Sequence, residues 1–129
     1  MKIRGKINEG MRVAAKFTQV PWVRDQCIRK LSFDPFPGTL NLDIEDSGDL
    51  AILKDLKASK GVELVPENPF FCSAKCLPVL IAGRIKGAII FPMIEDYPPN
   101  KLELIAPVHL KDYLSVRTND LIEIEVLSP

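Results

Sequence analysis

Hydrophobic and polar residues alternate along several short stretches of the chain, a pattern typical of half-buried β-strands. The clearest example is residues 39–44, where the even positions are apolar and the odd positions are polar. It follows the segment Phe36-Pro37-Gly38-Thr39, which we expect to be a rigid turn because proline fixes φ and glycine permits positive φ. Successive side chains of a strand point to opposite faces, so residues 39–44 predict a strand with one apolar and one polar face.

Short alternating or apolar stretches predict further strands along the chain. They are expected at residues 2–7, 12–20, 62–65, 71–81, 85–91, 102–105 and 121–126. Residues 85–91 form a nearly unbroken apolar run, so we expect that strand to be buried on both faces. The preceding residues 82–84, Ala-Gly-Arg, are expected to turn the chain into it.

Helices are expected to be few. Val23, Cys27 and Leu31 are spaced four apart, which predicts a helix at residues 22–31 with one apolar side. Residues 50–56 show a weaker helical pattern, and residues 108–114 predict a helical turn or two. Six or more short strands with few helices indicate a mainly β fold. A closed or nearly closed barrel is favoured because closure removes exposed strand edges.

The composition fits one globular domain covering residues 1–129, because the chain has no repeat or linker and 47% of its residues are hydrophobic. Seventeen basic and seventeen acidic side chains cancel, which argues against nucleic acid as a partner. The first residues lack the apolar run of a signal peptide, and no segment is long enough to span a membrane. We therefore expect a cytoplasmic protein with neither a nucleic-acid nor a membrane partner.

The polar side of residues 39–44 is the first candidate for chemistry. Thr39, Asn41 and Asp43 offer a hydroxyl, an amide oxygen and a carboxylate on one face of the strand. These are hard oxygen ligands, which Mg²⁺ prefers alongside phosphate oxygens. The simpler interpretation is the solvated face of an ordinary strand. The alternation alone leaves both open.

Four segments together point to a family. The chain reads Phe-Asp-Pro-Phe-Pro-Gly-Thr-Leu-Asn-Leu at residues 33–42 and Gly-Ala-Ile-Ile-Phe-Pro at residues 87–92. It then reads Leu-Glu-Leu-Ile-Ala-Pro at residues 102–107, followed by His109 and Leu110, and Asn-Asp-Leu-Ile-Glu-Ile at residues 119–124. In this order and at near-family spacing, the segments resemble the archaeal CTP-dependent riboflavin kinases. In that family the first segment reads Gly-Phe-x-Pro-x-x-Gly-Thr-Leu-Asn-Leu.

The resemblance implies a small six-stranded cradle-loop barrel and a reaction. CTP would donate its γ-phosphoryl group to the 5′-hydroxyl of riboflavin, giving FMN and CDP. Thr39 and Asn41 would hold Mg²⁺, and strand geometry agrees because residues two apart project together. Glu103 would contact the flavin and orient or deprotonate the acceptor hydroxyl. The nucleotide would lie against Val108, His109, Leu110 and Lys111.

Two positions depart from the family pattern. The family carries a glycine-rich loop, roughly Gly-x-Gly-x-Gly and a basic residue, over the nucleotide phosphates. The equivalent nucleotide-binding residues here are Gly10, Met11, Arg12, Val13, Ala14 and Ala15, and only the first glycine is retained. Glycines matter in such loops because backbone N–H groups must approach the phosphates without a Cβ in the way. The second departure is Glu95, which stands where the family has a flavin-side threonine.

Three functions are therefore weighed. The missing loop glycines favour a catalytically inactive barrel that binds a flavin or a nucleotide, whereas the retained Thr39, Asn41 and Glu103 favour an active riboflavin kinase. A small nucleic-acid-binding barrel is disfavoured because the chain has no net charge and no basic aromatic face. We predict the kinase, with riboflavin, FMN and a nucleoside triphosphate as partners. The sequence makes no prediction of the oligomeric state.

The remaining conspicuous residues have ordinary structural interpretations. Cys72 and Cys76 could resemble half of a metal site, but Cys27 and His109 are too few to complete a four-ligand zinc site. We expect buried cysteines that act as small apolar residues. Trp22 is expected in the core rather than against a flavin.

Overall fold

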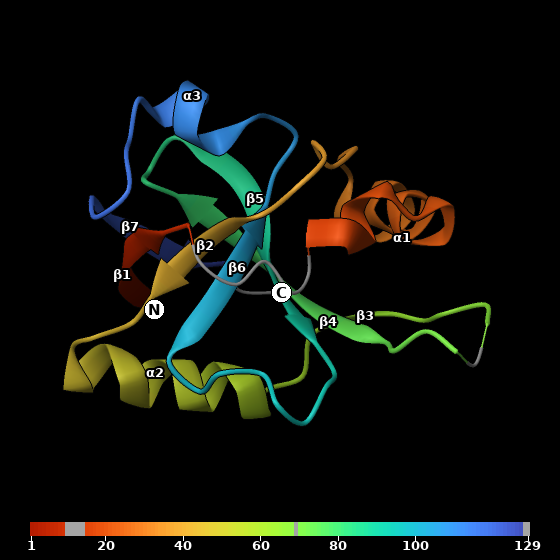
Figure 1. Cartoon of the computed structure of the whole chain (residues 1–129), viewed down its shortest axis with the longest axis horizontal. Coiled ribbons are helices and arrows are strands. Elements are labelled where there is room, and N and C mark those ends of the chain that lie inside the picture. The colour runs from red at the N-terminus through yellow and green to blue at the C-terminus, as the bar shows by residue number, and fades with distance from the viewer. Residues whose placement is uncertain (10–14, 69, 128–129) are drawn as a thin grey trace.

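The strands of the chain close into a barrel. The computed structural model describes residues 1–9, 15–68 and 70–127. Six antiparallel strands form the closed wall in the order β4-β5-β6-β2-β1-β7, and β7 pairs back onto β4. Their bounds are β1 (Lys2–Asn8), β2 (Leu40–Asp43), β4 (Ala74–Ile81), β5 (Ile85–Pro92), β6 (Lys101–Ile105) and β7 (Leu121–Val126). The predicted six-stranded barrel is confirmed (Figure 1).

The strand β4 is long enough to belong to two structures. Its second half pairs with β7 and closes the barrel, whereas its first half pairs with the short strand β3 (Val62–Leu64). The hairpin of β3 and β4 extends away from the barrel (Figure 1). The seventh strand is therefore an addition to the barrel wall and not a part of it.

The barrel interior is filled by the apolar side of each strand. Leu40, Leu42 and Ile44 are at most 6% exposed, as the alternation of residues 39–44 predicts. On the polar side of that stretch, Asn41 is only 5% exposed, whereas Thr39 and Asp43 are partly exposed. The interpretation as a solvated face therefore does not hold at Asn41. Residues 87–92 of β5 are all buried, which confirms a strand buried on both faces.

A helix covers the outside of β4, β5 and β6. The chain enters α1 (Pro21–Gln26) at a proline, which is favourable in the first helical turn, and continues into the π-helical η2 (Cys27–Leu31). Trp22, Val23 and Cys27 are buried in a second apolar cluster with residues of the three strands. The predicted helix at residues 22–31 and the core position of Trp22 are confirmed.

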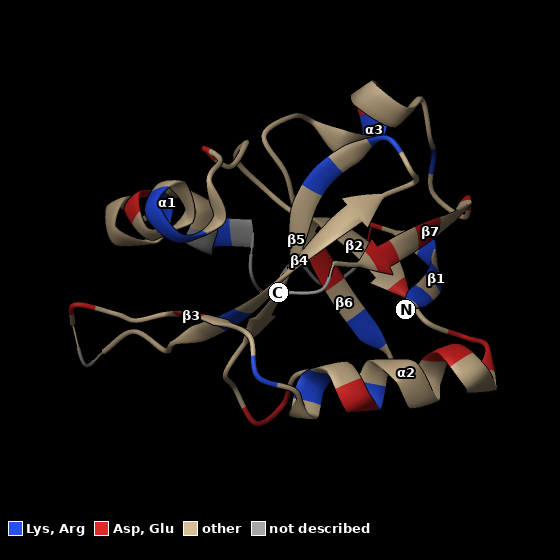
Figure 2. Ribbon diagram, turned by 180° about the vertical axis from the view of Figure 1, so that it is seen from behind, with Lys and Arg blue, Asp and Glu red and all other residues tan. Residues whose placement is uncertain are grey.

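Two further helices lie on opposite sides of the barrel, α2 (Ser47–Ala58) and α3 (Leu110–Leu114) (Figure 1). The helix α2 is longer than the predicted residues 50–56, because Asp46 caps it by accepting a hydrogen bond from the Asp49 N–H at 3.0 Å. Acidic and basic residues, all of them aspartates and lysines, follow one another along α2 (Figure 2). None of the helices in the described part of the chain is long and apolar enough to cross a membrane.

The prediction of a strand at residues 12–20 is wrong for residues 15–20, the part of this stretch that the structure describes. The residues Ala15–Gln19 form a 3₁₀-helix, η1, and residues 10–14 lie outside the described residues. Thr18 is 2% exposed, and its hydroxyl accepts a hydrogen bond from the Gly38 N–H at 2.8 Å. The segment therefore bonds to the Pro-Gly turn, and not to a neighbouring strand.

Candidate active site

The turn before β2 is held against the segment that follows β6. The Phe36 N–H donates to the Ala106 carbonyl at 2.8 Å, and Gly38 adopts a φ of +107°, which suits glycine. The strands β2 and β6 then pair along their length. The fold thus brings together the segments at residues 33–42 and 102–107, which are far apart in the sequence.

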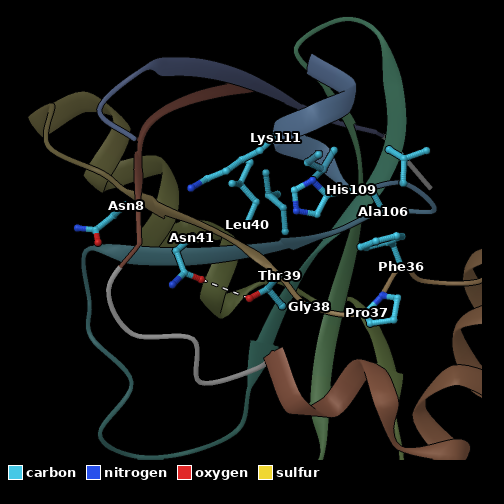
Figure 3. A pocket seen from close by; sticks show the side chains of 13 residues that line it. Asn8, Phe36, Pro37, Gly38, Thr39, Leu40, Asn41, Ala106, His109 and Lys111 are labelled. Carbon is cyan, nitrogen blue, oxygen red and sulfur yellow. Dashed lines mark hydrogen bonds between the residues drawn. The ribbon is translucent and has the colours of Figure 1, made fainter. Parts of the chain in front are cut away.

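A pocket opens between this turn, the end of β1 and the start of α3 (Figure 3). We call it the polar pocket. It is lined by Asn8, Phe36, Pro37, Gly38, Thr39, Leu40, Asn41, Leu104, Ala106, Val108, His109, Leu110 and Lys111. The two proposed metal ligands and the four expected nucleotide contacts after β6 therefore lie around one pocket.

Thr39 and Asn41 bring two oxygen atoms close together. The Thr39 Oγ1 lies 3.3 Å from the Asn41 Oδ1 and 2.7 Å from the Glu103 Oε1. The hydroxyl has one proton, and the shorter contact to the carboxylate is the better hydrogen bond. Mg²⁺ takes octahedral ligands at 2.0–2.1 Å, which places neighbouring ligand oxygens about 3 Å apart. The spacing of Thr39 and Asn41 therefore fits a pair of ligands to one such ion.

Asp43, the third oxygen ligand considered from the sequence, does not join them. Its carboxylate is paired with the Lys101 ammonium and accepts a hydrogen bond from the Asn8 Nδ2. Burial alone would raise the pKa of Asp43, but the hydrogen bonds from Lys101 and Asn8 and the charge of Lys101 hold it below its usual value. Asp43 is a structural ion-pair partner at the end of β2.

Glu103 is buried between the polar pocket and a second one. It is 2% exposed and lies on β6 between Asn41 of β2 and Ile90 of β5. Its Oε1 accepts from the Thr39 hydroxyl, and its Oε2 accepts from the Tyr97 hydroxyl at 3.0 Å. Burial and the neighbouring Glu103 carboxylate raise the pKa of Tyr97, so this phenol stays a hydrogen-bond donor. Two donors from different directions fix the orientation of the carboxylate.

The second pocket lies on the Tyr97 side of Glu103, and we call it the aromatic pocket. It is lined by Lys57, Lys75, Phe91, Pro92, Met93, Ile94, Glu95 and Tyr97. Glu95, one of the two expected flavin contacts, is exposed at its edge. Desolvation by burial lowers the pKa of both lysines. The aromatic pocket is thus mainly apolar, with two cations in its wall.

The nucleotide side of the polar pocket has contacts of its own. The His109 Nδ1 accepts from the Asp112 N–H at 3.4 Å and so caps α3, and its ring meets the Phe36 ring edge-on at 5.4 Å. The Lys111 ammonium bonds to the Glu9 Oε1 at 2.7 Å. His109 therefore has a structural role and also stands at the pocket wall. The expected phosphate-loop residues 10–14 lie outside the described residues, and Ala15 begins η1.

Asn8, Lys57 and Tyr97 are among the residues near these pockets that were not predicted from the sequence. Asn8 lies opposite Asn41 across β1 and β2, and Asp43 fixes its amide. Lys57 comes from α2 and Tyr97 from the loop before β6, outside the four family-like segments. Only the pairing of distant elements brings these three side chains to the site.

The cysteines contribute no metal site. Cys76 is fully buried and Cys72 half-buried, and neither forms a disulfide. No group of three or more His, Cys, Asp or Glu residues is placed to hold a metal ion within the described residues. Burial raises the pKa of the Cys27 thiol to about 11, as expected for an inert apolar cysteine.

Known proteins are similar to this chain over nearly its whole length. A family model named CTP-dep_RFKase, with the description "Domain of unknown function DUF120", matches residues 7–126. The riboflavin kinase of Methanocella arvoryzae is 36% identical over 122 residues, which is 95% of this chain and 55% of that protein. The riboflavin kinase of Archaeoglobus fulgidus is 34% identical over 130 residues, covering 98% of this chain and 55% of that protein.

A shorter relative matches end to end. The riboflavin kinase of Sulfurisphaera tokodaii is 32% identical over 130 residues, which is 98% of this chain and 95% of that protein. The chain thus spans about half the length of the Methanocella and Archaeoglobus proteins and nearly all of the Sulfurisphaera protein.

Proposed function

The chain belongs to the family of CTP-dependent riboflavin kinases, and from this membership we propose that it phosphorylates riboflavin. CTP donates the γ-phosphoryl group to the 5′-hydroxyl, and the products are FMN and CDP. The observation that carries the proposal is the position of Glu103, a buried carboxylate held between two pockets by Thr39 and Tyr97. A carboxylate at the meeting point of two substrates is placed to orient the acceptor hydroxyl and accept its proton.

The two pockets suit the two substrates. The nucleotide lies in the polar pocket against Val108, His109, Leu110 and Lys111, which line it. The flavin ring lies in the aromatic pocket, whose apolar wall and Phe91 and Tyr97 rings suit a flat aromatic ligand. The ribityl chain then runs toward Glu103, because Tyr97 belongs to this pocket and bonds to that carboxylate.

Glu103 orients the acceptor and takes its proton. The 5′-oxygen of riboflavin forms a bond to the γ-phosphorus, the bond from that phosphorus to the β–γ bridging oxygen breaks, and CDP leaves with the electron pair. The hydroxyls of Thr39 and Tyr97 hold the carboxylate from two directions, which fixes its orientation toward the acceptor. Phosphoryl transfer depends mostly on positioning and charge neutralisation, so a sparse site is sufficient.

Thr39 and Asn41 are the proposed ligands of Mg²⁺, which would neutralise charge on the nucleotide phosphates. The 3.3 Å spacing of their oxygens supports this assignment. The ligand pair also sits on the nucleotide side of Glu103, as the reaction requires. The cytoplasmic location and the absence of a nucleic-acid partner stay predictions from the sequence.

The experiment incubates the purified chain with riboflavin, Mg²⁺ and one of CTP, ATP, GTP or UTP, and separates FMN from riboflavin by chromatography. We expect FMN with CTP and its loss in Thr39→Ala and in Asn41→Ala. Thr118→Ala and Asn100→Ala are matched controls at exposed positions and are expected to keep the activity.

The alternative function, a binding module without transfer, is favoured by the single glycine left in the phosphate loop. It predicts no FMN with any nucleotide but saturable quenching of flavin fluorescence. That result would replace the kinase proposal.

A further inference from the structure

Lys57 occupies an unusual position in the wall of the aromatic pocket. Its ammonium donates to the Pro98 carbonyl at 3.1 Å and to the Pro99 carbonyl at 3.2 Å. It also stands over two rings, 5.9 Å from the centre of Phe91 and 5.5 Å from the centre of Tyr97. The side chain thus connects the end of α2 to the loop that carries Tyr97.

The neighbouring Lys75 differs in its hydrogen bonds. Its ammonium donates to three carbonyls at the end of α2, those of Leu56 at 2.8 Å, Lys57 at 2.6 Å and Ser59 at 2.7 Å. An ammonium carries three protons, so Lys75 is fully used by the fold. Lys57 has two acceptors in the described part of the chain and keeps one N–H for a ligand.

A hydrogen-bond acceptor on a ligand would strongly stabilise the Lys57 ammonium in the wall of the aromatic pocket. The aromatic pocket is mainly apolar, and Lys57 is partly buried in its wall. A charged donor removed from water is stabilised strongly when a hydrogen-bond acceptor replaces the lost water. Burial lowers the pKa of Lys57, which agrees with incomplete solvation of its charge.

We propose that Lys57 recognises the flavin ring by donating its third N–H to a ring carbonyl of the isoalloxazine. The two aromatic side chains beneath the ammonium hold it at the pocket wall, and Tyr97 links the same pocket to Glu103. Lys57 is therefore a specificity-determining residue for the acceptor substrate. This inference rests on the proposed function, because that function supplies the flavin.

The test uses lumiflavin, the isoalloxazine ring with a methyl group in place of the ribityl chain. Lumiflavin has no hydroxyl to phosphorylate, so its binding reports on the ring pocket independently of kinase activity. Titration of the full chain is followed by flavin fluorescence. We expect saturable binding to the unsubstituted protein and binding at least tenfold weaker to Lys57→Met.

Lys54→Met is the matched control, since Lys54 is exposed on the same helix one turn earlier. It is expected to bind lumiflavin like the unsubstituted protein. Thermal unfolding of each variant separates a loss of recognition from a loss of fold, and Lys57→Arg, which keeps a charged donor, is expected to restore part of the binding.

The outcomes separate this inference from the proposed function. If riboflavin is phosphorylated but lumiflavin does not bind, or binds Lys57→Met as tightly as the unsubstituted protein, the role of Lys57 is refuted and the kinase stands. If lumiflavin binding depends on Lys57 but no nucleotide yields FMN, the ring site stands and the kinase is refuted. A folded Lys57→Arg that binds no better than Lys57→Met also counts against the proposal.

Discussion

The Thr39 hydroxyl oxygen lies 2.7 Å from the Glu103 Oε1, although 64 residues separate the two in the sequence. The contact follows from the pairing of β2 with β6, in which Asn41 lies opposite Glu103. It joins a proposed metal ligand to the proposed base. Several consequences of this arrangement can be measured.

Replacing Glu103 with glutamine keeps the size of the side chain and removes its basicity. We expect FMN formation to fall by about 10²–10⁴-fold, the usual contribution of a positioned acid–base group. The KM for CTP should change little, because Glu103 does not line the polar pocket. Steady-state kinetics with both substrates measure the rate of FMN formation and the KM for CTP separately. Glu63→Gln, on the exposed side of β3, is the control. Full activity in a folded Glu103→Gln variant would rule out Glu103 as the general base.

Thr39 is expected to act through its oxygen. Thr39→Ser keeps the hydroxyl, so this variant should keep the interaction with Glu103 and most of the activity. Thr39→Val has a similar volume but no oxygen, and it should need a much higher Mg²⁺ concentration for half-maximal activity. The measurement is a Mg²⁺ titration of FMN formation at saturating CTP. Equal Mg²⁺ dependence of the serine and valine variants would contradict metal ligation by Thr39.

Asp43 is expected to make stability depend on pH. Its pKa is lowered in the folded protein, so it stabilises the fold above the ordinary carboxyl pKa and loses this effect as the pH falls through the folded value. Asp43→Asn should reduce the free energy of unfolding at pH 7 by about 1.5–3 kcal/mol, the size of one hydrogen bond to a charged group.

Urea unfolding of both proteins at pH 7 and near pH 3 measures this effect. The difference between the unsubstituted protein and Asp43→Asn should shrink at the lower pH, because the unfolded carboxyl is then largely protonated and the charge of Asp43 contributes less to stability. A difference that stays constant over this range would show that the Lys101 pairing contributes nothing through charge.

Gly87 allows the close approach of β5 to β6. A Cβ at this position would lie 2.4 Å from the Ile105 carbonyl oxygen, which is backbone and cannot rotate away. Gly87→Ala should therefore lower the free energy of unfolding by about 1–3 kcal/mol, the usual cost of overpacking. Lys86→Ala, at the exposed neighbouring position, is the control in the same denaturation experiment. Equal stability of the two variants would mean that β5 and β6 can move apart to accommodate the Cβ without a loss in the free energy of unfolding.

The barrel strands could be predicted from alternation because their apolar sides fill one interior. Residues 15–19 could not, because the buried Thr18 accepts a hydrogen bond from the Gly38 N–H, a contact 20 residues away that local alternation does not reveal. Asp43 looked like a ligand because alternation places it on the polar side of the strand but does not reveal which residue pairs with it. That partner, Lys101, lies directly opposite on β6.

The aromatic pocket shows the same limit of local patterns. Lys57 belongs to a helix with a weak sequence signal, and Tyr97 to a loop, so neither gave a sign of chemistry. Their shared pocket arises because Lys57 bonds to the carbonyls of that loop across 41 and 42 residues of sequence. By contrast, Thr39, Asn41 and Glu103 were predicted to belong to one site, because the family that their segments resemble has these residues in its active site.

The most direct test of the account measures FMN and CDP together after the purified chain is incubated with riboflavin, CTP and Mg²⁺. We predict that the two products appear in equal amounts and that neither forms in Glu103→Gln above a small residual rate. CDP formed without FMN, or riboflavin left unchanged with CTP and with every other nucleotide, would contradict phosphoryl transfer to riboflavin by this chain.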